Sequence, residues 1–360
     1  MAITELDIGG AEQAFVRVAD GLKRRGWDVR VISLRNAGAL AGPLQAVGIP
    51  VVALNCGGFL DLRAVCRMRA ELKKHPADAL LTFLHQANIA GRLAGCWAKV
   101  PWIVSGIRVA DRRWSVRISE RLTSRCVDHY SAVSESVART HRDLCRISTE
   151  RMTVIRNGVD VDAIQSAVPT DRATLGCETT DIIVLSVGRL SQQKAPLEVL
   201  QAFKQFRLTC IARGKRARLL FVGDGPLREV LQTRINAAGL QNEVRVLGWR
   251  PDVWGLMRSS DVLVLASHWE GLPNVILESQ AAGLLVVASD VDGCSEVISD
   301  KFNGRLFPSG DCGELARILL EVTDSQVNSA AMTAAAKRLV DETFQWETCI
   351  EKFHAMLTRR

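Results

Sequence analysis

The sequence lacks the long apolar runs, paired cysteines and aromatic clusters that mark several large classes of protein. No uninterrupted apolar stretch approaches the roughly 18 residues of a membrane-spanning helix, so a transmembrane protein is not expected. The ten cysteines stand singly, with no Cys-x-x-Cys pair and no histidine at metal-ligand spacing, which argues against a zinc site or a disulfide framework. Aromatic residues make up 5% of the chain and Tyr130 is the only tyrosine, so no nucleic-acid-binding motif is supported.

Signals for export and for a redox cofactor are also missing. The residues after Met1 lack the basic and apolar regions of a secretory signal, so we expect a cytoplasmic protein. No Gly-x-Gly-x-x-Gly follows a predicted strand with an acidic residue about 20 positions on, which disfavours a nicotinamide-dependent dehydrogenase. We therefore expect neither a bound cofactor nor a metal ion.

The chain does have an ordinary globular composition with an uneven distribution of charge. Its 360 residues are 48% apolar and 24% charged, and at roughly 150 residues per domain they predict two domains. Residues 1–160 hold 24 Lys and Arg against 15 Asp and Glu, whereas residues 161–360 hold 22 against 24. An anionic partner for the first half follows, either a phosphate-bearing acceptor, a lipid surface or nucleic acid.

Short apolar runs alternate with segments of helical period along the whole chain, which predicts an α/β protein with two parallel sheets. Strands are predicted at 29–33, 51–54, 79–83, 102–105, 129–133 and 153–155, and then at 182–187, 218–222, 244–247, 262–266 and 285–288. We predict an N-terminal domain at 1–160, a C-terminal domain at 161–342, with a hinge near 157–172, and a last helix within 343–360 that packs back towards the first domain. The strand expected before Gly9 and Gly10 spans only residues 2–6, which suggests a shortened start.

The sharpest local motif is the segment from His268 to Glu278, which follows a predicted strand and runs into a helix. Ligands of open parallel sheets bind where strands end and helices begin, because free backbone N–H groups point there. Glu270 and Glu278 can each accept hydrogen bonds from vicinal sugar hydroxyls. The loop between them presents backbone amides to a sugar or a phosphate, through Gly271, Leu272, Pro273 and Asn274. Taken alone, the two acids are equally well explained as an ordinary first-turn acid and a solvated helix residue.

A second strand-to-helix junction carries two cations. Gly188 and Arg189 follow the strand predicted at 182–187, and Lys194 stands just before a helix that opens at Pro196. A fork-shaped guanidinium and a point-charge ammonium together suit a diphosphate, although a solvated surface pair is the simpler alternative. Gly223 and Leu247 end two further strands, where a nucleotide base would lie against backbone and apolar side chains.

Two features of the first half occupy equivalent positions. Gly9 and Gly10 end the short first strand and open a helix, so their amides can approach a phosphate or an acceptor closely. His85 follows the strand predicted at 79–83, at the same sheet edge. A packed or merely exposed histidine is the alternative there.

In this order the motifs resemble glycosyltransferase family 4 of the GT-B superfamily, the retaining type of bacterial polysaccharide and lipid-linked synthesis, over essentially the whole chain. The resemblance rests on Gly9-Gly10-Ala11-Glu12, Ile155-Arg156-Asn157-Gly158-Val159-Asp160, Val187-Gly188-Arg189-Leu190 with Lys194, the Glu270 to Glu278 spacing, and Phe344-x-Trp346. It implies two Rossmann-like domains facing a cleft and a nucleotide-sugar donor, UDP- or GDP-linked. The sequence departs from the family pattern at Arg156, where Pro is usual, at Ala195, where Gly is usual, and at Ser279, where Ala is usual.

The resemblance also implies roles for individual residues. Glu278 would hold the ribose hydroxyls, Glu270 would lie beside the transferred sugar, Arg189 and Lys194 would bind the diphosphate, and His85 would approach the scissile bond. The transfer would retain anomeric configuration by front-face departure, with no nucleophilic residue. A poorly anchored Gly9-Gly10 loop would instead leave a weak or inactive nucleotide-sugar-binding protein, and a GT-B epimerase is a further alternative.

A basic helix is predicted in the first half. Arg113, Arg117, Arg121 and Arg125 recur every fourth residue, with Trp114, Ile118 and Leu122 beside them. Such a helix would rest on the anionic inner face of a membrane, where a lipid-linked acceptor sugar would lie. A solvated helix face is the alternative interpretation.

Overall fold

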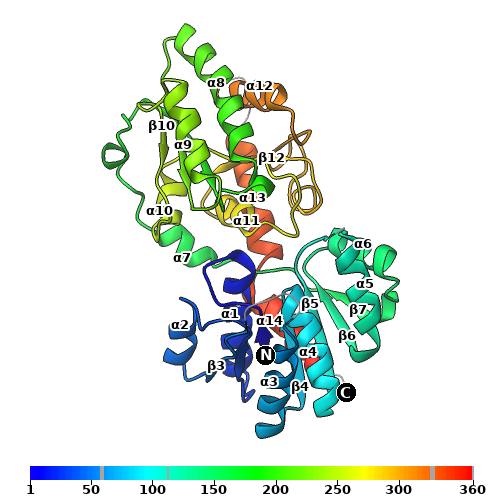
Figure 1. Ribbon diagram of the computed structural model, residues 1–360. Coiled ribbons are helices and arrows are strands. Elements are labelled where there is room, and N and C mark those ends of the chain that lie inside the picture. The colour runs from blue at the N-terminus through cyan, green and yellow to red at the C-terminus, as the bar shows by residue number, and fades with distance from the viewer. Residues whose placement is uncertain (57–60, 112, 325–328, 359–360) are drawn as a thin grey trace. The chain divides into compact units, whose positions relative to one another are not determined.

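Two all-parallel sheets organise the chain, which a computed structural model describes over residues 1–56, 61–111, 113–324 and 329–358. The first sheet belongs to an N-terminal unit made of Met1–Gly158 and Trp346–Arg360, and the second to a C-terminal unit made of Val159–Gln345. In each unit helices cover both faces of the sheet (Figure 1). The prediction of two Rossmann-like parallel-sheet domains is therefore confirmed.

The N-terminal sheet has seven strands in the order β3-β2-β1-β4-β5-β6-β7. They are β1 (Ala2–Ile3), β2 (Val31–Ser33), β3 (Val51–Ala53), β4 (Ala79–Phe83), β5 (Trp102–Ile107), β6 (His129–Ala132) and β7 (Met152–Val154). Although β1 is only two residues long, it pairs with β2 on one side and with β4 on the other. The shortest strand of this sheet is thus a central one.

Successive side chains of these strands point alternately into two separate hydrophobic cores. Ile3, Val31 and Leu81 face one cluster, whereas their neighbours Ala2 and Leu80 face the other. The first cluster is completed by α1 (Gly10–Arg24) and α14 (Trp346–Thr358), and the second by α3 (Leu62–Lys74) and α4 (His85–Ala98). The remaining helices of the unit are α2 (Ala41–Ala46), α5 (Trp114–Thr123), η1 (Ser124–Cys126), α6 (Glu135–Cys145) and η2 (Thr149–Arg151).

The last helix, α14, is an integral part of the N-terminal unit. It lies against α1, and its buried Phe353 packs its ring 5.9 Å from that of Phe83, measured between centroids. Trp27 donates a hydrogen bond of 2.9 Å from Nε1 to Nδ1 of His354, and Arg25 forms an ion pair with Glu347. The end of the chain therefore completes a core whose other members come from the first 160 residues. Residues 359 and 360 of the predicted 343–360 segment lie outside the described residues.

The C-terminal sheet has six strands in the order β10-β9-β8-β11-β12-β13. They are β8 (Ile182–Val187), β9 (Ala217–Val222), β10 (Val244–Val246), β11 (Val262–Leu265), β12 (Leu285–Ser289) and β13 (Arg305–Phe307). The sequence analysis did not predict β13, because its apolar run is only Leu306 and Phe307 before Pro308. The side chain of Arg305 is buried, and its guanidinium forms ion pairs with Asp300 at 2.9 Å and with Glu321 at 2.6 Å.

Helices α8 (Pro196–Ala212) and α12 (Cys312–Thr323) lie against each other over one face of this sheet. Phe203 and Phe206 of α8 and Phe221 of β9 are buried in the core of this unit. The other helices are α7 (Val161–Ser166), η3 (Arg172–Leu175), η4 (Gln192–Lys194), α9 (Arg228–Ala237), α10 (Val253–Arg258), α11 (Asn274–Ala281) and α13 (Ser329–Thr343). Within the described residues, no helix combines the length and the apolar character needed to cross a lipid bilayer.

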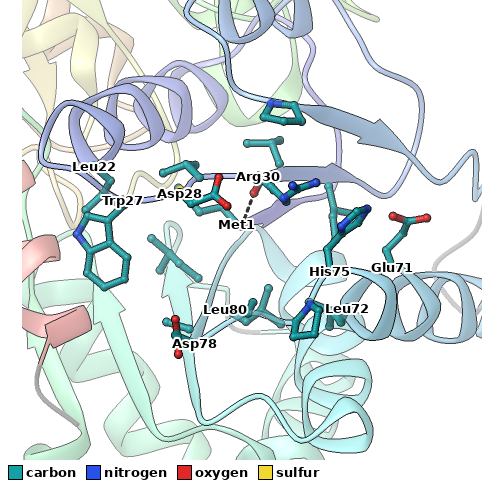
Figure 2. A pocket seen from close by; sticks show the side chains of 18 of the residues that line it. Met1, Leu22, Trp27, Asp28, Arg30, Glu71, Leu72, His75, Asp78 and Leu80 are labelled. Carbon is teal, nitrogen blue, oxygen red and sulfur yellow. Dashed lines mark hydrogen bonds between the residues drawn. The ribbon is translucent and has the colours of Figure 1, made fainter.

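A cavity of about 210 Å³ lies at the amino ends of the strands of the N-terminal sheet (Figure 2). Met1, Trp27, Arg30, His75, Asp78 and Leu80 are among its lining residues. The terminal amine donates a 2.6 Å hydrogen bond to the carbonyl of Arg30, and burial lowers its pKa to about 5. Because Gly9, Gly10 and His85 follow strands at their carboxyl ends, this cavity lies at the opposite edge of the sheet.

Candidate functional site

Each sheet reverses its strand order at one point, and the predicted site residues follow the strands on either side of it. In the N-terminal sheet the reversal lies between β1, which precedes Gly9, and β4, which precedes His85. In the C-terminal sheet it lies between β8, which precedes Lys194, and β11, which precedes Glu270. A reversal of this kind opens a crevice at the carboxyl ends of the strands, where ligands of open α/β sheets bind.

Lys194 and Glu270 meet across the C-terminal crevice. The ammonium of Lys194 forms an ion pair with Oε1 of Glu270, although the two residues are 76 positions apart. Ser267 donates a hydrogen bond of 2.6 Å to the same carboxylate oxygen, and Ser289 fixes the backbone of Ser267 at 2.6 Å. Glu270 is only 6% exposed, so this pair is the means by which a buried carboxylate is satisfied.

Backbone contacts join the loops that carry these two side chains. The amide of His268 donates to the carbonyl of Gln193, and the side-chain amide of Gln193 donates to the carbonyl of Trp269, both at 2.8 Å. On the other side, His268 Nε2 lies 3.1 Å from Glu198 of α8. The positions of Lys194 and Glu270 are therefore fixed by main-chain geometry as well as by their own charges.

Glycines allow the crevice loops to approach closely. A Cβ on Gly223, which has φ +128°, would lie 2.1 Å from the carbonyl oxygen of Gly188. Likewise, a Cβ on Gly293 would lie 2.4 Å from the carbonyl oxygen of Gly271. No side chain fits at either position, which explains why both positions 223 and 293 are occupied by glycine. Ala195 also has a left-handed φ of 47°, the conformation that accounts for the glycine usual there in the resembling family.

Glu278 occupies a different environment on α11. That helix begins at Asn274 after Pro273, so Glu278 stands about one turn inside it. Desolvation raises the pKa of the half-buried Glu278 carboxyl to about 7. Within the part of the chain that the structure describes, no hydrogen bond or ion pair joins its carboxylate to another side chain, so its accepting capacity is available to a ligand.

The remaining predicted donor-site residues lie at the same edge of the C-terminal sheet. Arg189 is exposed directly after β8, and no ion-pair partner engages its guanidinium among the described residues. Leu247 follows β10 and is half-buried, while Gly271 and Leu272 are buried in the β11 loop. The structure thus brings Lys194 together with Glu270 and places Arg189 and Glu278 at the crevice without a direct contact to that pair.

In the N-terminal unit, Gly9 caps α1 and His85 opens α4. The amide of Gln13 donates to the carbonyl of Gly9 at 2.9 Å, and no side chain caps the helix there. His85 is preceded by Leu84, whose φ of 71° and ψ of 147° belong to a region that side-chain-bearing residues rarely adopt. Strain at a strand-to-helix junction is a recurrent mark of functional sites.

Two residues that sequence reasoning missed lie behind His85. Glu120 Oε1 is 3.6 Å from His85 Nδ1, and Glu120 Oε2 is 2.7 Å from Arg92 Nη1. Both Glu120 and Arg92 are buried. A signal was present, because Arg92 is the only charged residue in the Ala- and Gly-rich α4, where a lone charge on a buried helix needs a partner.

The predicted basic helix is shorter than its arginine repeat. Helix α5 ends at Thr123, so Arg125 lies in η1 and Arg113 stands at the N-cap, paired with Asp111 at 2.5 Å. Arg117 and Arg121 lie within the helix. Three apolar residues at every fourth position are strongly exposed, namely Trp114 at 73%, Ile118 at 47% and Leu122 at 77%. The exposed stripe is thus both apolar and basic.

No group of three or more His, Cys, Asp or Glu side chains in the described residues is arranged to hold a metal ion. The charges at the C-terminal crevice are instead those of Arg189, Lys194, Glu270 and Glu278.

Two family models match the two halves of the chain. Residues 8–163 match the model described as Glycosyltransferase Family 4, and residues 168–339 match the model described as Glycosyl transferases group 1. The first match contains Gly9, Gly10 and His85, and the second contains the whole C-terminal crevice.

Curated relatives and solved structures show similarity over most of the chain. A UDP-Gal:alpha-D-GlcNAc-diphosphoundecaprenol alpha-1,3-galactosyltransferase of Escherichia coli is 26% identical over 339 residues, which cover 89% of this chain and 86% of the relative. An N,N'-diacetylbacillosaminyl-diphospho-undecaprenol alpha-1,3-N-acetylgalactosaminyltransferase of Campylobacter jejuni is 26% identical, over 79% of this chain and 78% of the relative. HepE of Anabaena, solved in complex with UDP-glucose, shares the fold with a TM-score of 0.86 at 22% identity, and the match covers 100% of both chains.

Proposed function

Because the chain belongs to the family 4 glycosyltransferases of the GT-B fold, we propose that it moves a hexose from a nucleoside-diphosphate sugar to a hydroxyl acceptor with retention of configuration. The acceptor class is a sugar of cell-surface polysaccharide or glycolipid synthesis, as the names of the relatives from Escherichia coli and Campylobacter jejuni suggest. The donor is UDP- or GDP-linked.

The observation that carries this proposal is the pair formed by Lys194 and Glu270 at the strand reversal of the C-terminal sheet. A cation held beside a carboxylate in a crevice suits a ligand with an anionic and a polyhydroxyl part. A diphosphate takes the place of the carboxylate as partner of Lys194, and Glu270 is then available to the hydroxyls of the transferred sugar. The exposed Arg189 supplies the second cation of the clamp.

The chemistry needs charge stabilisation more than it needs a nucleophile. As the bond between the sugar and the diphosphate breaks, negative charge grows on the leaving group, and the two fixed cations stabilise it. The leaving diphosphate accepts the proton of the acceptor hydroxyl on the same face of the sugar, which retains the anomeric configuration. Glu278, whose carboxylate has a free accepting capacity, binds the ribose hydroxyls of the donor, and Gly271 to Asn274 line the hexose with backbone amides.

The contacts that anchor the chain after the short first strand favour the enzyme over an inactive binding protein. Beyond β1, the chain is anchored by the hydroxyl of Thr4, which accepts from the amide of Ala87 at 3.2 Å, and by the carbonyl of Leu6, which accepts from the amide of Leu40 at 2.9 Å. These contacts secure the approach to Gly9 despite the two-residue strand.

Release of nucleoside diphosphate from a panel of UDP-, GDP- and ADP-sugars, with and without a diphospholipid-linked sugar acceptor, tests the function. We expect acceptor-dependent release with one donor, and an NMR spectrum of the product that shows the anomeric configuration of the donor. Lys194→Ala and Arg189→Ala should each lower kcat by roughly 100-fold or more, by analogy with lost oxyanion donors. Lys204→Ala, on the exposed side of α8, is the matched control. Wild-type turnover in both crevice variants would contradict the clamp.

We further propose that α5 rests on an anionic membrane surface where a lipid-linked acceptor is presented. The exposed Trp114, Ile118 and Leu122 insert at the headgroup boundary, and Arg117 and Arg121 meet lipid phosphates. On this proposal the protein binds peripherally to the inner face of the membrane, and each arginine of the pair adds about 1 kcal/mol near the surface.

A further inference from the structure

The nitrogen atoms of His85 face two different kinds of partner. Nδ1 lies 3.6 Å from the carboxylate of Glu120, and Nε2 lies 3.3 Å from the hydroxyl of Ser119. The carboxylate of Glu120 therefore faces the side of the ring that carries Nδ1. The side chain of His85 is 19% exposed, so the ring is held at the edge of the protein and not inside it.

Glu120 is itself fixed from behind. Its second oxygen is paired with Arg92 at 2.7 Å, and Arg92 is fully buried. The guanidinium also donates to Ser105 at 2.9 Å and to Thr123 at 3.0 Å, so it cannot turn away. Burial by itself would raise the pKa of the Glu120 carboxyl, but the charge of Arg92 and hydrogen bonds from His85 and Arg92 lower it to about 2.

An ionised carboxylate can only accept hydrogen bonds, so it favours the ring form that carries its proton on Nδ1. In that neutral form Nε2 has a lone pair. Ser119 can donate to this lone pair, or it can turn its proton to the carbonyls of Ser115 and Val116, which lie 3.0 and 2.9 Å away. Ser119 is therefore a partner that gives way without leaving a polar atom unsatisfied.

The backbone around His85 also restricts the orientation of its ring. Leu84 has a strained positive φ, and the following turn of α4 is tied to the sheet through Asn88, which accepts from Thr82 at 2.7 Å and donates to the carbonyl of Gly106 at 3.0 Å. Strain of this kind persists only where the surrounding contacts over-determine it. The contacts of Asn88 and of Glu120 supply that constraint.

We propose that Glu120, backed by Arg92, is a positioning residue for His85: it holds the ring with its proton on Nδ1 and so leaves Nε2 to accept a hydrogen bond from a sugar hydroxyl, which displaces Ser119. The role of His85 in the transfer rests on the proposed function, whereas the hold on the ring does not. The arrangement has the logic of a carboxylate that orients a functional histidine through its second nitrogen.

The tautomer of His85 can be read directly by ¹⁵N NMR of the ring nitrogens in histidine-labelled full-length protein, with the signal assigned from the spectrum of His85→Asn. We expect Nδ1–H in the wild type, against the Nε2–H form that an unconstrained histidine side chain prefers. A wild-type ring with its proton on Nε2 would overturn the proposal, whether or not any variant folds.

Glu120→Gln should shift the ring towards Nε2–H and lower kcat by roughly 10- to 100-fold with little change in the KM for the donor, as for other lost histidine-orienting carboxylates. Because this variant leaves Arg92 buried without its charge partner, the double variant Arg92→Met with Glu120→Gln removes both charges and keeps the packing. Asp128→Asn is the control, because it removes a carboxylate that accepts from the amide of Ile103 at 2.7 Å in the same unit without contact to His85.

Measurements of kcat separate a positioning role of Glu120 from a purely structural one. In a His85→Ala background, Glu120→Gln should cost no further kcat, because its effect passes through the ring. Equal losses in the two backgrounds would overturn the proposal, as would a folded Glu120→Gln protein with an unchanged tautomer. If no nucleotide sugar is turned over by the wild type, the proposed function fails, and the NMR result still decides the role of Glu120.

Discussion

Glu278→Gln should make the ligand-free protein more stable while it weakens donor binding. The carboxyl of Glu278 has a pKa of about 7 in the folded protein against an ordinary value of 4.5, because burial disfavours its charged form. A folded-state pKa above the unfolded value means that ionisation costs stability. This cost is absent at acidic pH, grows between about pH 4.5 and 7, and is complete above pH 7.

The size of the effect follows from the shift. At 1.36 kcal/mol for each pKa unit, the wild type loses about 3 kcal/mol at pH 8 and about 1 kcal/mol at pH 5. The neutral amide of Glu278→Gln avoids most of this loss. For a domain of this size, 1 kcal/mol of stability corresponds to about 2–4 °C, so the melting temperature of the variant should be higher by roughly 6–12 °C at pH 8. The gain should fall to a few degrees at pH 5.

Scanning calorimetry of Glu278→Gln and the wild type at pH 5 and pH 8, without ligand, measures this difference. Glu229→Gln, which removes an exposed acid on α9, controls for net charge. In parallel, the KM for the donor should rise roughly 10- to 100-fold, because charge-assisted hydrogen bonds to the ribose are lost. An unchanged or lower melting temperature at pH 8 would refute the burial argument, and an unchanged KM would refute the assignment of Glu278 to the donor.

Three further predictions concern other parts of the chain. Leu122→Glu should abolish flotation with anionic vesicles, whereas Leu208→Glu, at another strongly exposed position on α8, should leave it intact; equal flotation of both would remove α5 as the membrane contact. Gly223→Ala should lower the free energy of unfolding by more than about 2 kcal/mol, since its Cβ meets the carbonyl of Gly188, and Gly239→Ala, at a positive φ in open space, should cost less; chemical denaturation compares them. Two apolar residues added before Met1 should fill part of the cavity at the amino ends of the strands and remove the buried amine. Because the lowered pKa of this amine makes its charged form unfavourable below pH 8, the melting temperature should rise more at pH 6 than at pH 9. A lower melting temperature at both pH values would contradict this prediction.

Much of the fold was predictable because buried parallel strands are apolar and short and their helices are periodic. The run at 182–187 predicted β8, and the run at 79–83 predicted β4, without any tertiary information. The strand β13 was not predicted because it is short and begins with Arg305, whose burial depends on ion pairs with Asp300 and Glu321 that no local pattern reveals.

The site was predictable only as far as strand ends could be recognised. Arg189, Lys194 and Glu270 stand after strands, so their common edge followed from the parallel pattern, whereas the direct pairing of Lys194 with Glu270 required the strand order. Glu120 could not be assigned in the same way, because it lies within α5, where the pattern of arginines and apolar residues gives no sign that this one carboxylate is buried. Its contact with His85 joins residues 35 positions apart on separate elements, and sequence periodicity carries no information about such contacts.

The path of the chain makes the second sheet an insertion within the first unit. The chain enters that insertion at Val159 and leaves it at Gln345, and the amide of Val159 donates to the carbonyl of Phe344 at 2.8 Å, so the two ends of the insertion touch. A fragment cut at these points closes on itself, and we expect it to fold when it is expressed alone. The reverse excision is asymmetric: a fragment that stops at Gly158 forfeits Phe353 and Met356 from its core, so a stable first unit requires the final helix to be rejoined by a linker.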